Sequence, residues 1–561
     1  MSVGVTPIIA KSADTAPASR DASIKEQPAP LPAPDLQGPQ PLPLTRFMPI
    51  YIGLMLGVFI ISLDNTVVAT AQIPIVKDLG GSRLVSWLPT SFLIAQGAFA
   101  LFWGQTLGSF PSKYIFLLNV FLFELGSLVS AVAPNIAAVL AGRAVSGIGA
   151  AGMMSGAIQI LIETTTIQQR AVYVGLLGAL FAIAMIAGPL IGGALASVTW
   201  RWVFWINLPI GGVAFITNLL LTPARPPLGT NKSKPTAMTA RLRNLDVVGC
   251  AILTVGMCAL VIPISEAYQT GWSSWRIWLP IALAFPILAS FYAWVCFIGD
   301  GRAVIPRTLL HDLNLLGCVG VSFAVFWNAI LFMYLIPYYY QVVEGHSATK
   351  SGVDMLALMI TLAIGSVASG VVAKKTGHYW PQVTFFPLLG AIGAGISTLN
   401  SSTGIQIGSQ ILLGAGTGLV IQGPMLIVQA NTDKRLVSKA TSLVIFGQRF
   451  GGGMGSSISS AILAAQLPGA YRRFLPAGVD PEPYYHIDAT QILSLPADEI
   501  RAALLNAVTW VVHRIYLVGV PLFVVITLLM LTMVKATNIK TNTVVSKRSL
   551  LLGKGARAGV R

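Results

Sequence analysis

Residues 135–201 read NIAAVLAGRAVSGIGAAGMMSGAIQILIE (135–163), TTTIQQR (164–170) and AVYVGLLGALFAIAMIAGPLIGGALASVTWR (171–201). The first and third pieces are apolar runs, and each is long enough to cross a hydrocarbon core of about 30 Å as a helix. Arg143 lies in the first run, and a cluster of glycines surrounds Pro189 in the second. Because a permanent charge inside a membrane span is costly, Arg143 marks a pathway or a partner. These two spans are therefore the predicted functional centre.

The whole chain has the same apolar character. Its 561 residues are 54% hydrophobic and 10% charged, whereas an average soluble chain is about 25% charged. This composition predicts an all-α polytopic membrane protein. The net charge of +16 does not indicate nucleic-acid binding, because the basic residues lie in short loops and in the tails, as orientation in a membrane requires. The four cysteines lie in apolar runs without metal-ligand spacing, so we expect no disulfide.

The apolar runs predict fourteen transmembrane spans, arranged as six, two and six. They cover approximately residues 47–74, 84–105, 114–133, 137–162, 171–196, 202–221, 246–265, 277–298, 315–340, 352–373, 382–399, 404–428, 440–465 and 511–534. With the N-terminus inside, most Lys and Arg residues fall in the inner segments. The positive-inside rule therefore predicts that both tails are cytosolic.

Five parts are predicted along the chain. They are a disordered cytosolic tail (1–46), a six-helix bundle (47–221), a basic inner loop with two extra spans (222–314), a second six-helix bundle (315–535) with an outer loop (466–510), and a basic cytosolic tail (536–561). The bundles echo each other, because Gly147-Ile-Gly149 matches Gly414-Ala-Gly416 and places Gln410 where the first half has Arg143. Internal repeats that flank a central site are typical of transporters that rock between two states.

Several motifs together resemble the major facilitator superfamily, and specifically its fourteen-span drug:H⁺ antiporter group. The motifs are LDNTVV (63–68), Gly142-Arg143 with GIG (147–149), GPLIGG (188–193), WRWVFWINLP (200–209) and IPYYYQ (336–341). The resemblance covers about residues 47–535. It implies two pseudo-symmetric six-helix bundles and export of small molecules in exchange for protons.

The inner turn after the second span departs from the family pattern. Gly104 and Lys113 match it, whereas Gly108 and Ser112 stand where the family usually carries an Asp and an Arg. This weakened form looks like the one common in fungal exporters of toxins and other secondary metabolites. The resemblance therefore predicts a substrate of that class.

Two carboxylates lie within predicted spans. Asp64 is late in the first span, where a negative charge is disfavoured, so we interpret it as a proton carrier. The alternative is a helix-end residue that water reaches from the outer leaflet. Glu124 is in the middle of the third span and is a second candidate for proton coupling, the alternative being a structural hydrogen bond to a neighbouring helix.

Two arginines also lie within spans. Arg143 is interpreted as the counter-charge that responds to the protonation state of the cavity, although a fixed structural ion pair is the alternative. Arg449 is a similarly unusual charge within a span of the second half and a candidate cavity residue. It also fits an inner-facing arginine whose head group reaches the membrane surface.

Packing and cavity candidates complete the predicted site. Gly188, Pro189, Gly192 and Gly193 are interpreted as a packing and bending device, because small residues four apart let helices approach closely. Aromatic residues in the ninth span suit an apolar cavity, the alternative being a stripe that faces lipid or a neighbouring helix. The candidate cavity residues are Trp327, Asn328 and Tyr334, together with Gln410 and Arg449.

Other function classes find no support in the sequence. Gly147-Ile-Gly149-Ala-Ala-Gly152 fits the G-x-G-x-x-G pattern, but it lies inside an apolar span rather than after a strand, so it does not indicate nucleotide binding. We find no ATP-hydrolysis motif, no catalytic constellation and no metal-ligand cluster. The chain is therefore predicted not to be an enzyme and to need no cofactor, and an ion gradient must supply its energy.

The sequence thus predicts a monomeric proton-coupled exporter of a hydrophobic or amphipathic small molecule. Its predicted partners are the substrate, protons and the lipid bilayer. We expect it in the plasma membrane, with the vacuolar membrane as the alternative. The rival function is import of a siderophore or another small molecule by proton symport, and loss of growth on chelated iron in a deletion strain would favour it. A non-transporting receptor would need a soluble domain or a signalling tail larger than the short ones present.

Overall fold

The structure of the protein is a computed structural model. It describes residues 42–538, 543 and 544, except for 81–83, 85, 86, 166, 227–241, 244, 271, 400–402, 433–435, 485–491, 494, 497 and 498. Most of the two predicted tails and of the predicted basic inner loop lies outside the described residues, as does part of the predicted outer loop.

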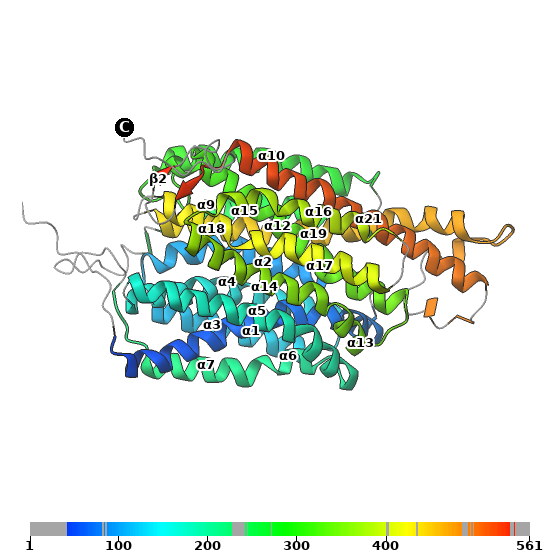
Figure 1. Ribbon diagram of the computed structural model, residues 1–561, viewed down its shortest axis with the longest axis horizontal. Helices are drawn as coiled ribbons and strands as arrows, with labels where there is room; N and C mark the ends of the chain where they lie inside the picture. Colours follow the sequence, from blue (N-terminus) through cyan, green and yellow to red (C-terminus); the bar gives the residue numbers. More distant parts are fainter. Residues whose placement is uncertain are drawn as a thin grey trace, which may run out of the picture.

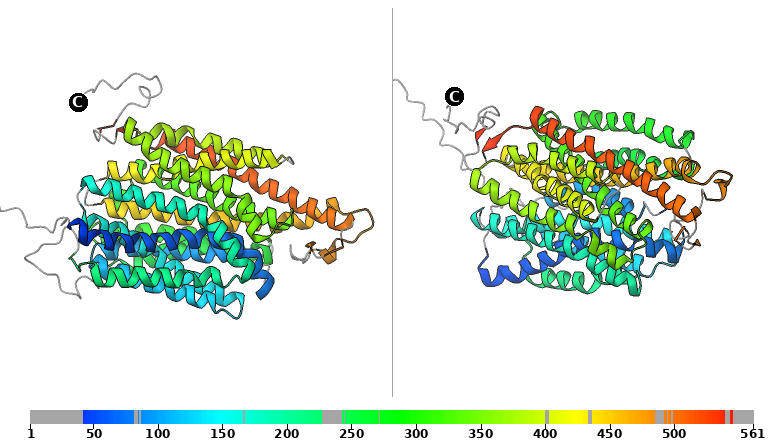
Figure 2. Two further views of the ribbon diagram at one scale, coloured as in Figure 1. Left: turned by 60° about the horizontal axis from the view of Figure 1, so that its bottom comes forward. Right: turned by 45° about the vertical axis from the view of Figure 1, so that its right-hand side comes forward.

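The described residues form mainly long α-helices that lie side by side along one direction (Figure 1 and Figure 2). The helices are α1 (Leu44–Leu79), α2 (Trp87–Leu107), α3 (Ser112–Ala131), α4 (Ile136–Thr164), α5 (Ile167–Val198), α6 (Trp202–Trp205), α7 (Asn207–Leu221), α9 (Val247–Thr270), α10 (Trp275–Ile298), α11 (Arg307–Leu310), α12 (Leu313–Val342), α13 (Ala348–Asp354), α14 (Leu356–Thr376), α15 (Trp380–Phe385), α16 (Pro387–Ile396), α17 (Thr403–Ile421), α18 (Gly423–Asn431), α19 (Val437–Phe474) and α21 (Glu499–Thr532). A 3₁₀ turn spans Glu482–Tyr484, and strands β1 (Thr537–Asn538) and β2 (Thr543–Val544) pair antiparallel.

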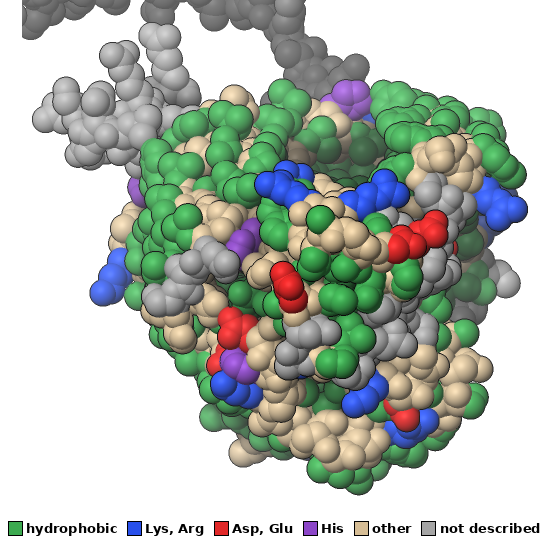
Figure 3. Space-filling model, turned by 90° about the vertical axis from the view of Figure 1, so that its right-hand side faces the viewer, with side chains coloured by type: hydrophobic (Ala, Val, Ile, Leu, Met, Phe, Trp, Pro, Cys, Tyr) green, Lys and Arg blue, Asp and Glu red, His purple; other side chains and the backbone are tan. Residues whose placement is uncertain are grey.

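Ten candidate membrane spans are present among the described residues, long and apolar enough to cross a bilayer. This confirms the predicted all-helical, multi-pass class. Figure 3 looks along the helices onto the end at the right of Figure 1, where hydrophobic side chains form the circumference and charged side chains gather on the end face. The outermost helix, α10, exposes Trp275, Phe285 and Phe297. Such a broad apolar surface suits contact with lipid.

Prolines divide several predicted spans into two helices. The predicted span 202–221 breaks at Ile206, and Pro209 lies in the first turn of α7. Pro387 is the first residue of α16, and Pro424 lies in the first turn of α18. Proline has no N–H to donate, so it is tolerated in the first turn of a helix, where the N–H has no intrahelical partner.

The fourth helix of each half packs against its neighbour in the same way. In α4, Gly147 lies against the backbone of Phe92 in α2, and in α17, Gly414 lies against the backbone of Leu358 in α14. A methyl group at either glycine would collide with the facing carbonyl oxygen. Both pairs of helices therefore approach backbone to backbone, which small residues allow.

The residues one turn before these glycines bond to the same neighbouring helices. The Nε of Arg143 donates to the carbonyl oxygen of Leu88 in α2 at 3.3 Å. The Oε1 of Gln410 accepts from the backbone N–H of Leu358 in α14 at 3.3 Å. Gln410 and Arg143 thus occupy equivalent places in the two halves.

Asp246 fixes the start of α9 next to the end of α10. Its side chain is 1% exposed. Its Oδ1 accepts from the N–H of Gly249 and from Nε1 of Trp294, both at 2.8 Å, and its Oδ2 accepts from the N–H of Val304 at 3.0 Å. Its own N–H donates to Oε1 of Gln105 in α2 at 2.9 Å. The carboxylate therefore ties the two extra helices to each other, and the backbone N–H of the same residue ties them to the first half.

We expect Asp246→Ala to lower the free energy of unfolding by about 3 kcal/mol, because it leaves buried donors unsatisfied at about 1–3 kcal/mol each. The measurement is unfolding of the purified protein in detergent. Asp300→Ala is the control, because Asp300 pairs with Arg307 at an exposed site and such pairs contribute little. Equal stability of the two variants would contradict this role of Asp246.

Both ends of the predicted outer loop 466–510 are helical. Helix α19 continues to Phe474 and α21 begins at Glu499, so both helices project beyond their neighbours (Figure 1, right). Arg472 and Arg473 lie in the last turn of α19, and Glu499 lies in the first turn of α21. Each charge is favourable at that end of a helix dipole. The apolar pattern predicts only the part of a helix that crosses the membrane, which explains the difference.

Candidate functional site

Asp64 and Arg143 form a buried ion pair. Asp64 lies in α1 and Arg143 in α4, and Nη1 of the arginine donates to Oδ2 of the aspartate. Both side chains are 1% exposed. The two residues that the sequence singled out separately are therefore direct partners.

Neighbouring helices supply further contacts to both members of this pair. Nδ2 of Asn207, the first residue of α7, donates to Oδ1 of Asp64 at 3.2 Å and to Oγ of Ser127 in α3 at 3.1 Å. The guanidinium of Arg143 lies over the ring of Phe92, with its Cζ 4.3 Å from the ring centroid. A buried ion pair is tolerated only where such additional contacts offset the loss of hydration. Asn207, Ser127 and Phe92 carry no signal in the sequence that predicts these contacts.

Glu124 lies close to this pair but stays unpaired. It is in α3 and faces α7, where a methyl group at Gly211 would overlap its carboxylate. Both carboxylate oxygens are buried and have no hydrogen-bond partner among the described residues. A carboxyl group in such surroundings is costly as an anion. The arrangement does not fit the structural hydrogen bond that was its alternative.

The glycines of the fifth-helix motif face two different neighbours. A Cβ at Gly188 would overlap the Thr66 side chain of α1, and one at Gly192 would meet the Thr70 hydroxyl at 2.5 Å and the Val67 carbonyl oxygen at 2.7 Å. These two glycines therefore let α5 approach α1 closely.

The other two residues of the motif meet the second half of the chain. A Cβ at Gly193 would lie 2.6 Å from Cα of Thr349 in α13, and the Thr349 hydroxyl donates to the Gly193 carbonyl oxygen at 2.9 Å. A Cβ at Gly352 would collide with the Pro189 carbonyl oxygen. The motif thus forms part of the contact between the two halves.

Tyr334 also bridges the two halves, next to the ion pair. Its hydroxyl donates to the carbonyl oxygen of Asn65 at 3.1 Å, and its own carbonyl oxygen accepts from Nε2 of Gln72 at 3.1 Å. Because Asn65 follows Asp64 directly, α12 touches α1 one residue away from the buried carboxylate.

At the inner turn, the two motif residues have different surroundings. A Cβ at Gly104 would collide with the Ser442 side chain of α19, so this glycine permits close approach of α2 and α19. Lys113 is half-buried and forms no ion pair within the described part of the chain. Ser112, which stands where the family usually carries an arginine, donates to Oε2 of Glu163 in α4 at 2.6 Å.

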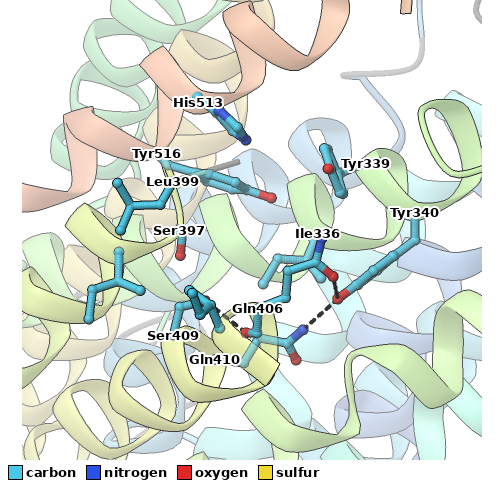
Figure 4. A pocket seen from close by; sticks show the side chains of 12 residues that line it. Ile336, Tyr339, Tyr340, Ser397, Leu399, Gln406, Ser409, Gln410, His513 and Tyr516 are labelled. Carbon is cyan, nitrogen blue, oxygen red and sulfur yellow. Dashed lines mark hydrogen bonds between the residues drawn. The ribbon is translucent and has the colours of Figure 1, made fainter. Parts of the chain in front are cut away.

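A pocket of about 420 Å³, part of it open to solvent, lies within the second half (Figure 4). It is lined by Ile336, Tyr339, Tyr340, Ile396, Ser397, Leu399, Ile405, Gln406, Ser409, Gln410, His513 and Tyr516. Gln410 is the one candidate cavity residue that lines it. Its Nε2 donates to the Tyr340 hydroxyl at 3.1 Å, and that hydroxyl donates to Oε1 of Gln406 at 3.1 Å.

The remaining cavity candidates lie on α12 and α19. Nδ2 of Asn328 donates to the carbonyl oxygen of Gly519 in α21 at 3.4 Å, and Nε1 of Trp327 is buried without a hydrogen-bond partner in the described structure. Arg449 is buried in α19. No group of three or more His, Cys, Asp and Glu side chains in the described ranges is placed to hold a metal ion.

Comparison with known proteins gives the family. Residues 54–456 match the sequence model of the Major Facilitator Superfamily. The chain belongs to this superfamily. It is 32% identical over 516 residues to the MFS-type transporter phomT of Diaporthe leptostromiformis, covering 89% of this chain and 84% of that one. It is 33% identical over 467 residues to the rubrofusarin-specific efflux pump aurT of Gibberella zeae, covering 82% and 84%.

A solved structure has the same fold. The transporter superposes with a TM-score of 0.59 on a bacterial homologue of the human lysosomal transporter Spinster, in an inward-facing and unoccupied conformation. The sequence identity is 14%, and the match covers 92% of this chain and 100% of that one. The sequence matches confirm the predicted family, and the solved structure agrees with it in fold. Family and fold are those of a membrane transporter for small molecules rather than an enzyme.

Proposed function

We propose that this major facilitator is a proton-coupled antiporter that exports a hydrophobic or amphipathic toxin, drug or secondary metabolite. The observation that carries the proposal is the buried Asp64–Arg143 ion pair, which lies one residue from the Tyr334 contact between the halves. The direction of transport is supported by relatives named as efflux pumps, such as aurT. The substrate class also rests on these relatives.

The proposal includes fourteen spans with both tails in the cytosol. Besides the ten candidate spans, α2, α5, α19 and the α15–α16 pair (Trp380–Ile396) occupy the positions of the other four predicted spans. An even number of spans fits the path of the chain. Helix α1 begins, and the pair of strands β1 and β2 lies, at the same end of the molecule (Figure 1, left). The plasma membrane and a monomeric state belong to the same proposal.

Proton coupling would work through the charge balance of the pair. A proton on Asp64 removes the negative partner of Arg143, and a buried charge without its partner is destabilised by about 3–5 kcal/mol. The protonated state must therefore rearrange around Arg143. The adjoining contact between α1 and α12 would transmit this rearrangement to the second half. Glu124, unpaired beside the site, is the second proton acceptor in this proposal.

Alternating access would require the contact between α5 and α13 to open. We expect Gly352→Val to separate the two halves at the contact between α5 and α13, because the added side chain collides with the Pro189 carbonyl oxygen. Spin labels at Val198 and Ile407, both exposed, should report longer distances in the variant than in the parent protein with its native cysteines replaced. The control is Gly370→Val, since a Cβ at Gly370 meets nothing within 4 Å. Unchanged distances between the two spin labels in Gly352→Val would contradict the proposal that the α5–α13 contact opens during transport.

The test of the proposed function is metabolite accumulation in cells with and without the gene. Cells that produce the transporter should release at least one compound that deletion cells retain, and Asp64→Asn and Arg143→Ala should retain it as the deletion does. Export at the wild-type level by both variants would overturn the coupling assignment. Loss of growth on chelated iron in the deletion strain, without retention of any compound, would favour import instead.

A further inference from the structure

Arg449 is a buried cation without a counter-charge. It lies in α19 and is 6% exposed. Its Nε has no hydrogen-bond partner, and no carboxylate in the described part of the chain forms an ion pair with it. Its guanidinium approaches the ring of Phe326 in α12, with Cζ 5.5 Å from the ring centroid. Arg143, in contrast, is paired with the carboxylate of Asp64.

The position of Arg449 excludes the interpretation that its head group reaches the membrane surface. A Cβ built at Gly97 of α2 would lie 3.2 Å from Cβ of Arg449 and 2.8 Å from the Met257 side chain of α9. One turn further along α19, a Cβ at Gly452 would lie 3.0 Å from the side chain of Ile330 and 3.5 Å from that of Leu93. Arg449 is thus enclosed by helices of both halves, at the interface of α2 and α19.

Two polar atoms on the helices that pack around Arg449 are also without a hydrogen-bond partner in the described structure. Oε1 of Gln96, the neighbour of Gly97, is buried without a hydrogen-bond partner among the described residues, and so is Oγ of Ser322. Ser322 lies four residues before Phe326 and therefore on the same face of α12. Buried polar atoms normally have hydrogen-bond partners, so the three helices that pack together here carry an unusual number of exceptions, which are Nε of Arg449, Oε1 of Gln96 and Oγ of Ser322.

We propose that Arg449 binds the anionic group of the transported molecule, so that the substrates are amphipathic organic anions carrying a carboxylate or an ionised phenol. The planar guanidinium presents N–H groups that match a carboxylate, while Phe326 and Met257 offer apolar surface to the body of the molecule. The inference rests on the proposed function, because it treats the α2–α19 interface as part of the transport pathway.

The test is equilibrium binding to the purified full-length protein in detergent, without any proton gradient. The probes are aromatic carboxylic acids and their primary amides, beginning with 2-naphthoic acid and 2-naphthamide and continuing with three-ring pairs. We expect at least one acid to bind wild-type protein about tenfold more tightly than its amide, as expected when a charge-assisted hydrogen bond is made. Arg449→Gln should remove this preference by weakening the binding of the acid.

Two further variants complete the design. Arg449→Lys keeps the charge but not the planar fork, so it should weaken the preference for the acid several-fold. Arg514→Gln is the matched control, because Arg514 is exposed and stacks on Trp510, with Cζ 3.7 Å from the ring centroid. It should bind both probes as the wild type does.

The proposal is wrong if no acid binds wild-type protein more tightly than its amide, or if Arg449→Gln keeps the preference. If Arg449→Gln does not fold, Arg449→Lys decides, and a preference equal to that of wild type contradicts the proposal. A negative binding result would leave the proposal of proton-driven export unaffected. Export that does not depend on the proton gradient would refute the proposed function without affecting the binding result.

Discussion

Asp64→Asn is expected to abolish uphill export. Asparagine has nearly the same size as aspartate, but it neither accepts a proton nor pairs with Arg143 as a charge. Removing one member of a buried ion pair costs about 3–5 kcal/mol, which corresponds to more than about 100-fold in an equilibrium. The conformation that buries Arg143 should therefore lose the stabilisation that the Asp64 carboxylate gives it. Proton entry should then no longer drive export.

The measurement is accumulation of the exported compound against its gradient, in cells with matched amounts of transporter. Asp78→Asn is the control, because Asp78 lies in the same helix and pairs with Arg201 at 3.0 Å, but the two side chains are 52% and 34% exposed. An exposed pair contributes little, so this variant should export normally. Wild-type export by Asp64→Asn would contradict the role of the buried carboxylate.

A double variant separates stability from coupling. Asp64→Asn with Arg143→Gln removes both charges, so no buried charge is left unpaired. We expect it to unfold at a higher temperature than Asp64→Asn alone, yet still to lack uphill export. Such non-additivity is the signature of two residues that interact directly.

The second large effect is expected for Gly188→Val. A Cβ at Gly188 would already overlap the Thr66 side chain, and valine adds two methyl groups at this contact between α1 and α5. Inserting atoms into a packed interface typically costs about 1–3 kcal/mol, and here the facing atoms include the α1 backbone. We expect most of the protein to lose its folded, monodisperse form in size-exclusion chromatography.

Gly212→Val is the matched control for this substitution. It also places a β-branched residue in a helix, but a Cβ at Gly212 meets nothing within 4 Å. The cost of valine as a helix former is therefore shared, and the difference between the variants reports the packing alone. Equal loss of folded protein in both variants would show that the close approach of α5 and α1 is unimportant.

The sequence predicted the membrane class and the two central charges for a simple physical reason. Length and apolarity suffice to identify a span, and a charge inside a span is rare enough to stand out. Asp64 and Arg143 were therefore found without knowledge of their contact. Asn207 was not, because a neutral amide at the start of a helix looks the same whether it faces lipid headgroups or a buried carboxylate.

Partners between distant segments were beyond the reach of the sequence. Arg143 and Arg449 look alike in the chain, yet one meets a carboxylate of α1 and the other meets none among the described residues. Tyr339 and Tyr340 of the 336–341 motif line a pocket only because α17 and α21 close it from elsewhere in the chain. Such differences depend on packing between helices, which local pattern does not specify.

The most direct test of proton coupling uses purified protein in sealed vesicles, loaded with the compound that the accumulation experiment identifies. The proposal predicts transport against the concentration gradient when a pH difference and a membrane potential are imposed, and none once an ionophore collapses both. Measured proton movement should accompany each transported molecule. Transport against the concentration gradient that continues at the same rate after the pH difference and the membrane potential have been collapsed would contradict proton coupling.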